Sequence, residues 1–206
     1  MLKYSGMLFV LLAIPGLPGC GKHDHLPDFG KVADFKFQER SGKEISLEQM
    51  QGKVWLASFV FTRCTGPCPQ VCATLARLQE QLKNQPHVQI VTFTVDPDRD
   101  NPKELDQYAS NFQADPNRWW FLTGKEEELH KLIRESFKLA VGRNPAELAK
   151  PGMEFIHSPR IVLVDKKGVI RGYYEGTPTD MEGKKIETYE PGIQKLLAAS
   201  KALASE

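Results

Sequence analysis

Two near-continuous apolar runs, each followed by a helical pattern, constrain the fold of this chain more than any other feature. Residues 54–61 and 88–95 carry few polar side chains, which is typical of strands that are covered on both faces of a sheet. From Cys68 onward, the residues after the first run have the spacing of an amphipathic helix, with apolar side chains at Val71, Leu75, Leu78 and Leu82. A buried strand that leads through a helix to a second buried strand predicts a parallel sheet.

Further elements extend this pattern on both sides. We expect strands at 32–37, 44–47, 54–61, 88–95, 119–122, 161–164 and 169–174, and helices at 68–85, 101–112, 125–137 and 190–203. Residues 138–156, which contain two glycines and two prolines, are expected to form a long loop. The order predicts an α/β, thioredoxin-like fold, in which a central, mostly parallel sheet is flanked by helices and carries an N-terminal and a C-terminal hairpin.

The N-terminal segment has the composition of an export signal. Lys3 precedes an apolar run at 7–14, which is too short to span a bilayer but suits the core of a signal peptide. Leu17-Pro18-Gly19-Cys20 resembles a bacterial lipobox, in which cleavage before the cysteine leaves that cysteine lipidated, although Pro18 departs from the usual small residue. A plain signal peptide or an uncleaved anchor is the alternative.

These features predict three parts and a location outside the cytoplasm. The protein is expected at the bacterial periplasm or cell surface, anchored to the membrane as a lipoprotein through Cys20. The formal net charge of +1, without a basic run, excludes nucleic acid as a partner. The predicted parts are a lipoprotein-type signal peptide at 1–19, a linker at 20–31 and one domain at 32–206.

The remaining three cysteines, Cys64, Cys68 and Cys72, lie within nine residues. An odd, crowded set in an oxidising compartment does not fit a structural disulfide framework, so the cluster is redox-active or metal-bound. Cys68 is at the expected start of a helix, where the helix dipole stabilises a thiolate. His157 lies far downstream, just before another strand. Two thiolates and an imidazole favour Cu(I), and imidazole also suits Cu(II), but the Cys-x3-Cys spacing alone does not decide between a disulfide and a metal.

Four motifs in order carry a family resemblance. They are Phe-Thr-x-Cys-x3-Cys-Pro at 61–69, Val-Asp-Pro-Asp-Arg-Asp at 95–100, Leu-Thr-Gly at 122–124, and His-Ser at 157–158 with the following Leu-Val-Asp-x-x-Gly at 163–168. Over roughly residues 30–200 the chain resembles the Sco/SenC family of copper-binding, thioredoxin-like proteins.

The resemblance implies a ligand set and a role. Cys64, Cys68 and His157 would bind one copper ion, as Cu(I) or Cu(II), with Asp96 nearby and Asp100 as the second choice. It implies a metallochaperone or thiol reductant that helps to assemble the copper site of cytochrome c oxidase. The implied partners are the copper-bearing subunit of that oxidase or another copper protein. An external thiol reductant is also expected, because a Cys64–Cys68 disulfide must be reduced before Cu(I) binds.

Other interpretations stay open at this level. An extracytoplasmic thiol–disulfide oxidoreductase would use Cys64 and Cys68, although Cys-x2-Cys spacing would have favoured it more. A peroxiredoxin is a poor fit, because Thr62 precedes Cys64 by two residues without the upstream proline of that family. We expect no turnover enzyme beyond thiol–disulfide reductase activity. Cys72 is expected to be a small core residue, with a role as a ligand or resolving thiol as the alternative.

Four further histidines carry weaker signals. His23 and His25 are expected to lie in a solvated linker, and His87 and His130 are expected at the surface.

The lipobox interpretation predicts separable effects on location and on metal binding. Cys20→Ala should release the protein from the membrane fraction while leaving the copper affinity of the purified protein unchanged, because Cys20 precedes the predicted domain. Cell fractionation and mass spectrometry of the mature N-terminus measure the first effect. A wild-type protein that carries no lipid and fractionates as soluble would contradict the lipobox, leaving the copper site unaffected.

Overall fold

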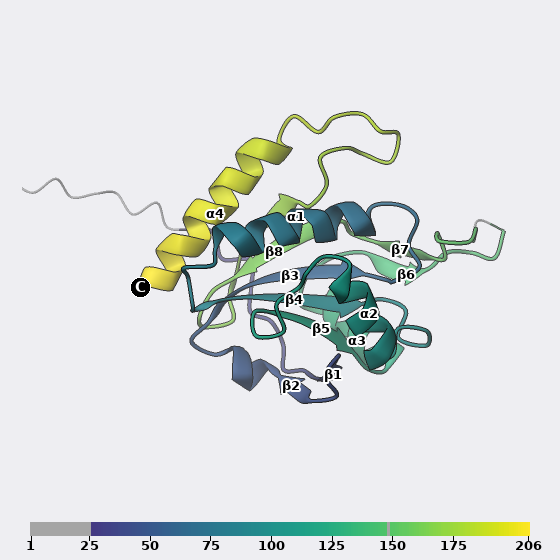
Figure 1. Cartoon of the computed structure of the whole chain (residues 1–206), viewed down its shortest axis with the longest axis horizontal. Helices are drawn as coiled ribbons and strands as arrows, with labels where there is room; N and C mark the ends of the chain where they lie inside the picture. Colours follow the sequence, from purple (N-terminus) through teal and green to yellow (C-terminus); the bar gives the residue numbers. More distant parts are fainter. Residues whose placement is uncertain (1–25, 148) are drawn as a thin grey trace, which may run out of the picture.

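A seven-stranded sheet forms the centre of the protein, with the strand order β2-β1-β5-β4-β3-β8-β9 (Figure 1). The computed structural model describes residues 26–147 and 149–206, so the predicted signal peptide, Cys20, His23 and His25 lie outside the described residues. The strands of this sheet are β1 (Lys36–Glu39), β2 (Glu44–Ser46), β3 (Val54–Val60), β4 (Val88–Thr94), β5 (Trp119–Thr123), β8 (Arg160–Val164) and β9 (Ile170–Glu175).

The sheet combines a parallel centre with antiparallel hairpins at both sides. β3 pairs with β4 and β4 with β5 in parallel, whereas β1–β2 and β8–β9 are the predicted hairpins and join the centre antiparallel to β5 and β3. Every residue of β3 and β4 is buried, as expected for strands covered on both faces. The thioredoxin-like α/β architecture predicted from the sequence is therefore confirmed.

Helices cover the sheet, and two of them lie side by side (Figure 1). The N-terminal part of α1 is bonded to the start of α4 through the hydroxyls of Thr74 and Tyr189, 2.7 Å apart. α2 begins after Asn101, whose side chain accepts from two backbone N–H groups and so caps the helix. The helices are α1 (Cys68–Gln81), α2 (Pro102–Ser110), α3 (Glu126–Glu135) and α4 (Tyr189–Ser205), and a 3₁₀ turn spans Leu47–Met50. Within the described ranges, no helix is long and apolar enough to cross a membrane.

An aromatic cluster packs one face of the sheet around Phe93 of β4. Its ring centroid lies 5.8 Å from that of Phe59 on the neighbouring strand and 5.9 Å from that of Phe137, just after α3. Phe35, Phe37 and Trp55 complete the cluster at 5.6 to 6.5 Å from Phe93. Offset and edge-on aromatic pairs at such distances add to the stabilisation that burial gives, so Phe93 anchors β4 to the layer below it.

Two expectations about the elements are wrong. The first strand begins at Lys36 rather than at residue 32, because residues 29–32 instead bond to residues 168–170 beside β9. The segment 138–156 is not a featureless loop, since β6 (Val141–Arg143) pairs antiparallel with β7 (Phe155–His157) in a separate two-stranded sheet. Strands of three residues are too short to produce a readable alternation, and their pairing depends on contacts distant in the sequence.

The aromatic cluster predicts a large difference between two phenylalanines. Phe93→Ala should lower the free energy of unfolding by about 3–5 kcal/mol, because it leaves a cavity in the middle of the buried cluster. Phe29→Ala is the matched control: this side chain is 46% exposed, and its loss should cost less than about 1 kcal/mol. Urea denaturation followed by circular dichroism measures both, and equal effects would contradict the assigned packing.

Candidate metal centre

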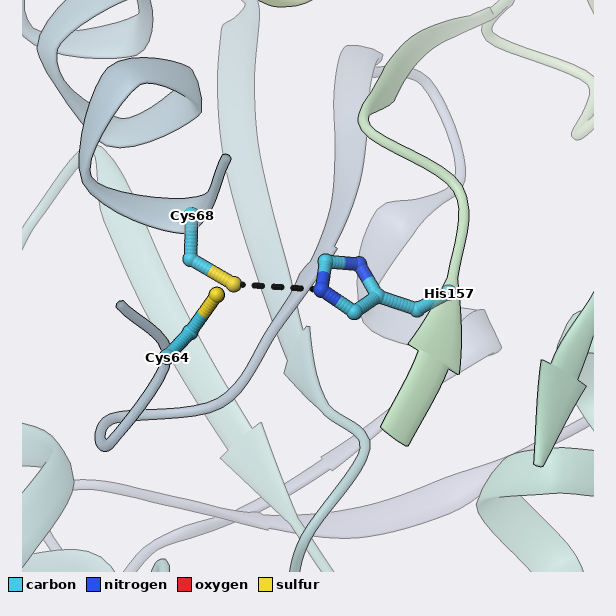
Figure 2. Close-up of side chains that lie close together, drawn as sticks. All are labelled: Cys64, Cys68 and His157. Carbon is cyan, nitrogen blue, oxygen red and sulfur yellow. Dashed lines mark hydrogen bonds between the residues drawn. The ribbon is translucent and has the colours of Figure 1, made fainter. Parts of the chain in front are cut away.

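Three donor atoms from separate parts of the chain meet at one edge of the sheet. Cys64 lies in the loop after β3, Cys68 is the first residue of α1, and His157 is the last residue of β7. Their sulfur and nitrogen atoms all lie within 4.8 Å of one another. Figure 2 shows the two sulfurs and the imidazole pointing toward the same small volume, with Cys68 Sγ 3.2 Å from His157 Nε2. The structure thus brings together the three residues selected from the sequence.

The two thiols of this group differ in acidity. The Cys68 side chain, as a hydrogen-bond partner of the Cys64 sulfur, is the main cause that holds the pKa of Cys64 well below its usual range, although burial acts in the opposite direction. Burial is the main cause that raises the pKa of Cys68. The reduced site therefore holds one thiolate beside one protonated thiol, rather than two repelling charges.

The imidazole of His157 is held in a fixed orientation. Its ring packs edge-on against Phe61, with the centroids 5.7 Å apart. Its Nδ1 lies 3.4 Å from the carbonyl oxygen of Ser158. A neutral imidazole that donates its Nδ1 proton to a carbonyl presents its Nε2 lone pair to a metal, and such a bond fixes the tautomer of many metal-binding histidines.

The hairpin that carries His157 is tied to the cysteine loop through the backbone. The N–H of Thr65 donates to the carbonyl oxygen of Gly152, at 3.2 Å. Gly152 has φ +83°, and a Cβ at this position would lie 2.4 Å from the Thr65 side chain. Glycine is therefore needed here for both its conformation and the close approach.

Ion pairs tie the same hairpin to the loop after β4. Arg99 lies 3.1 Å from Glu154, next to β7, and 3.5 Å from Asp96. Arg143 of β6 pairs with Asp98 at 2.6 Å and also with Glu126 of α3. The Asp-rich loop therefore contacts the hairpin through its side chains and is fixed relative to it.

The two aspartates singled out in the sequence have different surroundings. Asp100 accepts bonds from the backbone N–H and hydroxyl of Thr62, and from the hydroxyl of Thr94. Asp100 thereby joins the ends of β3 and β4, and its partner Thr62 lies two residues before Cys64. Asp96 is buried with no hydrogen bond to its carboxylate oxygens among the described residues, and burial raises its pKa. Neither carboxylate belongs to the Cys–Cys–His group.

The other candidate residues lie outside this group. Cys72 is fully buried in α1, and burial raises the pKa of its thiol to about 12, as expected for a core residue. His87 is exposed, as predicted. The expectation that His130 lies at the surface is wrong: it is buried, and its Nε2 bonds to the carbonyl oxygen of Val95 at 2.8 Å. His130 faces the core because it shares the inner side of α3 with Leu129 and Ile133.

Sequence reasoning missed the residues that support the imidazole. Phe61, Gly152 and Glu154 act through contacts with segments far away in the chain. Phe61 was recognised only as the first residue of the cysteine motif, and Gly152 only as the second residue of a Pro-Gly pair that marks a turn. That signal gives the turn but not its contact with the cysteine loop.

The fold and the site define a thioredoxin-like protein with a Cys-Cys-His centre able to hold a soft metal. A family model described as SCO1/SenC matches residues 24–189, and the chain belongs to this family. The SCO1 protein homolog of Bacillus subtilis is 35% identical over 181 residues, which is 85% of this chain and 89% of that protein. A Stutzerimonas stutzeri protein named as copper-binding is 29% identical over 160 residues, 77% of this chain and 75% of that protein.

Solved structures of relatives share the fold. A SCO1/SenC family lipoprotein from Bacillus anthracis is 30% identical with a TM-score of 0.72, over 84% of this chain and 95% of that one. BsSco, described as a member of the Sco family of cytochrome c oxidase assembly proteins with a disulfide switch, is 31% identical with a TM-score of 0.70, over 88% and 97% of the two chains.

The difference in acidity between the thiols predicts selective alkylation. At about pH 6 an ordinary thiol is almost wholly protonated, whereas Cys64, with its lowered pKa, remains a reactive thiolate. Iodoacetamide should therefore label Cys64 first. Labelling of Cys68 should require a higher pH than labelling of an ordinary thiol does, because the pKa of Cys68 is raised. Peptide mass spectrometry measures the sites, and the urea-unfolded chain, in which Cys64, Cys68 and Cys72 should react alike, is the control. Equal labelling of Cys64 and Cys68 in the folded protein would contradict the assignment.

Proposed function

We propose that this protein binds one copper ion through Cys64, Cys68 and His157, and that it serves the assembly of the copper site of cytochrome c oxidase. The observation that carries the proposal is the convergence of these three donors within 4.8 Å. Two thiolates and an imidazole match Cu(I), and the same set with a weaker fourth donor suits Cu(II). Membership in the SCO1/SenC family and similarity to a relative named as copper-binding support this choice of metal.

The protein's own residues set the conditions for loading. A metal requires deprotonated sulfur ligands, and the raised pKa of Cys68 means that this thiol gives up its proton when the ion arrives. Cys64 is the first contact, because its lowered pKa leaves it as a thiolate. His157 is already oriented by Phe61 and Ser158. Such preorganisation lowers the ordering cost of binding.

Reduction of the site precedes loading with Cu(I). Two sulfurs this close can form a disulfide, and a Cys64–Cys68 bond would occupy both thiolate ligands. An external dithiol supplies two electrons and two protons, so that the disulfide becomes two thiols while the dithiol is oxidised. The disulfide switch described for BsSco supports this part of the proposal. The proposed location is the bacterial periplasm or the cell surface, with the protein held at the membrane by a lipid on Cys20, and the similarity to a SCO1/SenC family lipoprotein supports this part of the proposal.

A second function is favoured by one specific observation. The lowered pKa of Cys64 beside a protonated Cys68 is the arrangement of a nucleophilic and a resolving thiol. In that case the protein delivers electrons rather than copper, as a thiol reductant for the cysteines of a copper-binding partner. A copper titration of the reduced protein, made beside its reduction potential, separates the two functions. No copper binding together with a reducing potential, low enough to reduce the cysteines of the partner, would favour the thiol reductant.

The ligand assignment predicts graded losses of copper binding. Cys64→Ser or Cys68→Ser should abolish tight binding of the single ion, because a hard hydroxyl replaces a soft thiolate. His157→Ala should weaken Cu(II) binding more than Cu(I) binding, since two thiolates remain for Cu(I). Competition titrations with a Cu(I) chelator and the Cu(II) absorption spectrum measure both.

Cys72→Ser is the matched control for Cys68→Ser. Cys72 lies four residues further along α1 and outside the three-donor group, so this variant should keep the wild-type copper affinity once its fold is verified by circular dichroism. Unchanged affinity in Cys64→Ser, or a loss of binding in Cys72→Ser, would overturn the ligand set.

A further inference from the structure

Two segments that border the cysteine loop carry exposed apolar side chains. Of the four large hydrophobic residues that are exposed in the described part of the chain, Met153 and Ile156 lie on the hairpin of His157, and Met181 lies in the loop between β9 and α4. Met181 is the most exposed of them, at 68%. Scattered apolar side chains at a surface are ordinary, but a group around one site indicates a use there.

Met181 lies next to the loop that joins the two cysteines. A Cβ placed on Gly66 would lie 3.8 Å from the Cε methyl of Met181 and 3.9 Å from Sγ of Cys64. Both side chains therefore border the same open spot beside Gly66, which has no side chain of its own to fill it. A methionine side chain has three rotatable bonds, so its sulfur can reach this spot by changing its rotamer.

The backbone that carries Met181 is held firmly. Oδ1 of Asp180 accepts hydrogen bonds from the backbone N–H groups of Glu182 and Lys184. The carbonyl oxygen of Asp180 accepts from the backbone N–H of Gly183. These bonds close a tight turn that contains Met181. The residue before the turn is anchored to α1, where the Thr179 hydroxyl donates to the Gln70 side chain at 3.2 Å. The loop runs past the end of α1 where the cysteine motif begins (Figure 1). The backbone N–H of Asp180 also donates to the carbonyl oxygen of Lys184. Four hydrogen bonds within the turn and one to α1 therefore fix the position of Met181.

We propose that the Met181 thioether is an additional soft ligand, which coordinates Cu(I) on the solvent side of Cys64 as the ion enters and leaves the three-donor group. This inference rests on the proposed copper function and adds a route for the ion. Thioether sulfur binds Cu(I) in preference to hard divalent cations. One bond from copper to Met181 forms as one bond to His157 or a thiolate breaks. The thioether is neutral, so the step moves no proton, and copper stays Cu(I) throughout.

Methyl resonances test the contact directly. The full chain is labelled with [¹³C-methyl]methionine, reduced, and titrated with one equivalent of Cu(I), which is diamagnetic. The resonance that is absent in Met181→Leu should shift on Cu(I) addition, whereas the resonance absent in Met153→Leu should stay in place. Leucine keeps the apolar volume and removes only the sulfur. A Met181 resonance that does not move while Cu(I) binds stoichiometrically would overturn the inference and leave the proposed function intact.

Transfer kinetics give a second readout. Stopped-flow transfer of Cu(I) from the loaded protein to bicinchoninate should slow by about tenfold in Met181→Leu, the lower range for loss of a supporting metal contact. Met153→Leu, which removes an exposed methionine of the hairpin that carries His157, should match the wild type. Equal rates in all three proteins would overturn the proposed route. Wild-type protein that binds no Cu(I) would instead refute the copper function itself.

Discussion

The burial of β3 and β4 on both faces is the constraint on which the rest of the structure depends. Two parallel strands without a solvated face need a layer above and a layer below, and α1 and α4, which contact β3, together with the aromatic cluster around Phe93 supply these layers. Parallel pairing also brings the carboxyl ends of both strands to one edge of the sheet. The cysteine loop and the Asp-rich loop therefore begin side by side, and the bonds from Thr62 to Asp100 join them.

The imidazole reaches this edge by a different route. β6 and β7 lie outside the central sheet, so the position of His157 depends on how this small hairpin is attached. The ion pairs of Arg99 and Arg143 are partly exposed, and such pairs contribute little to stability one by one. Their effect is on geometry, because with the Thr65–Gly152 bond they fix the hairpin at several points relative to both loops. The ion pairs and the Thr65–Gly152 bond thus position the imidazole, whereas the buried strands stabilise the fold.

The sequence predicted the fold and the three donors, because both leave local patterns. Buried strands and amphipathic helices have a visible period, and the Cys-x3-Cys motif and His157 are unusual enough in type to be selected on their chemistry. The hairpin of β6 and β7, the burial of His130 and the contact of the Gly152 turn with the cysteine loop could not be predicted from the sequence. Each depends on a partner distant in the chain: Val141 pairs with His157, and His130 bonds to Val95. A short segment whose structure is set by its partner carries no period of its own.

The separation of the donors along the chain couples metal binding to folding. Cys68 and His157 are 89 residues apart, and only the folded protein brings them together. An unfolded chain still offers the Cys64 and Cys68 pair but loses the oriented imidazole, so an ion held by all three donors favours the native state by the difference between the two affinities. A bound ion would therefore also hold the cysteine loop and the hairpin of His157 together. An emptied protein should therefore be more open to proteases than a loaded one, and its lifetime would report how much metal is available.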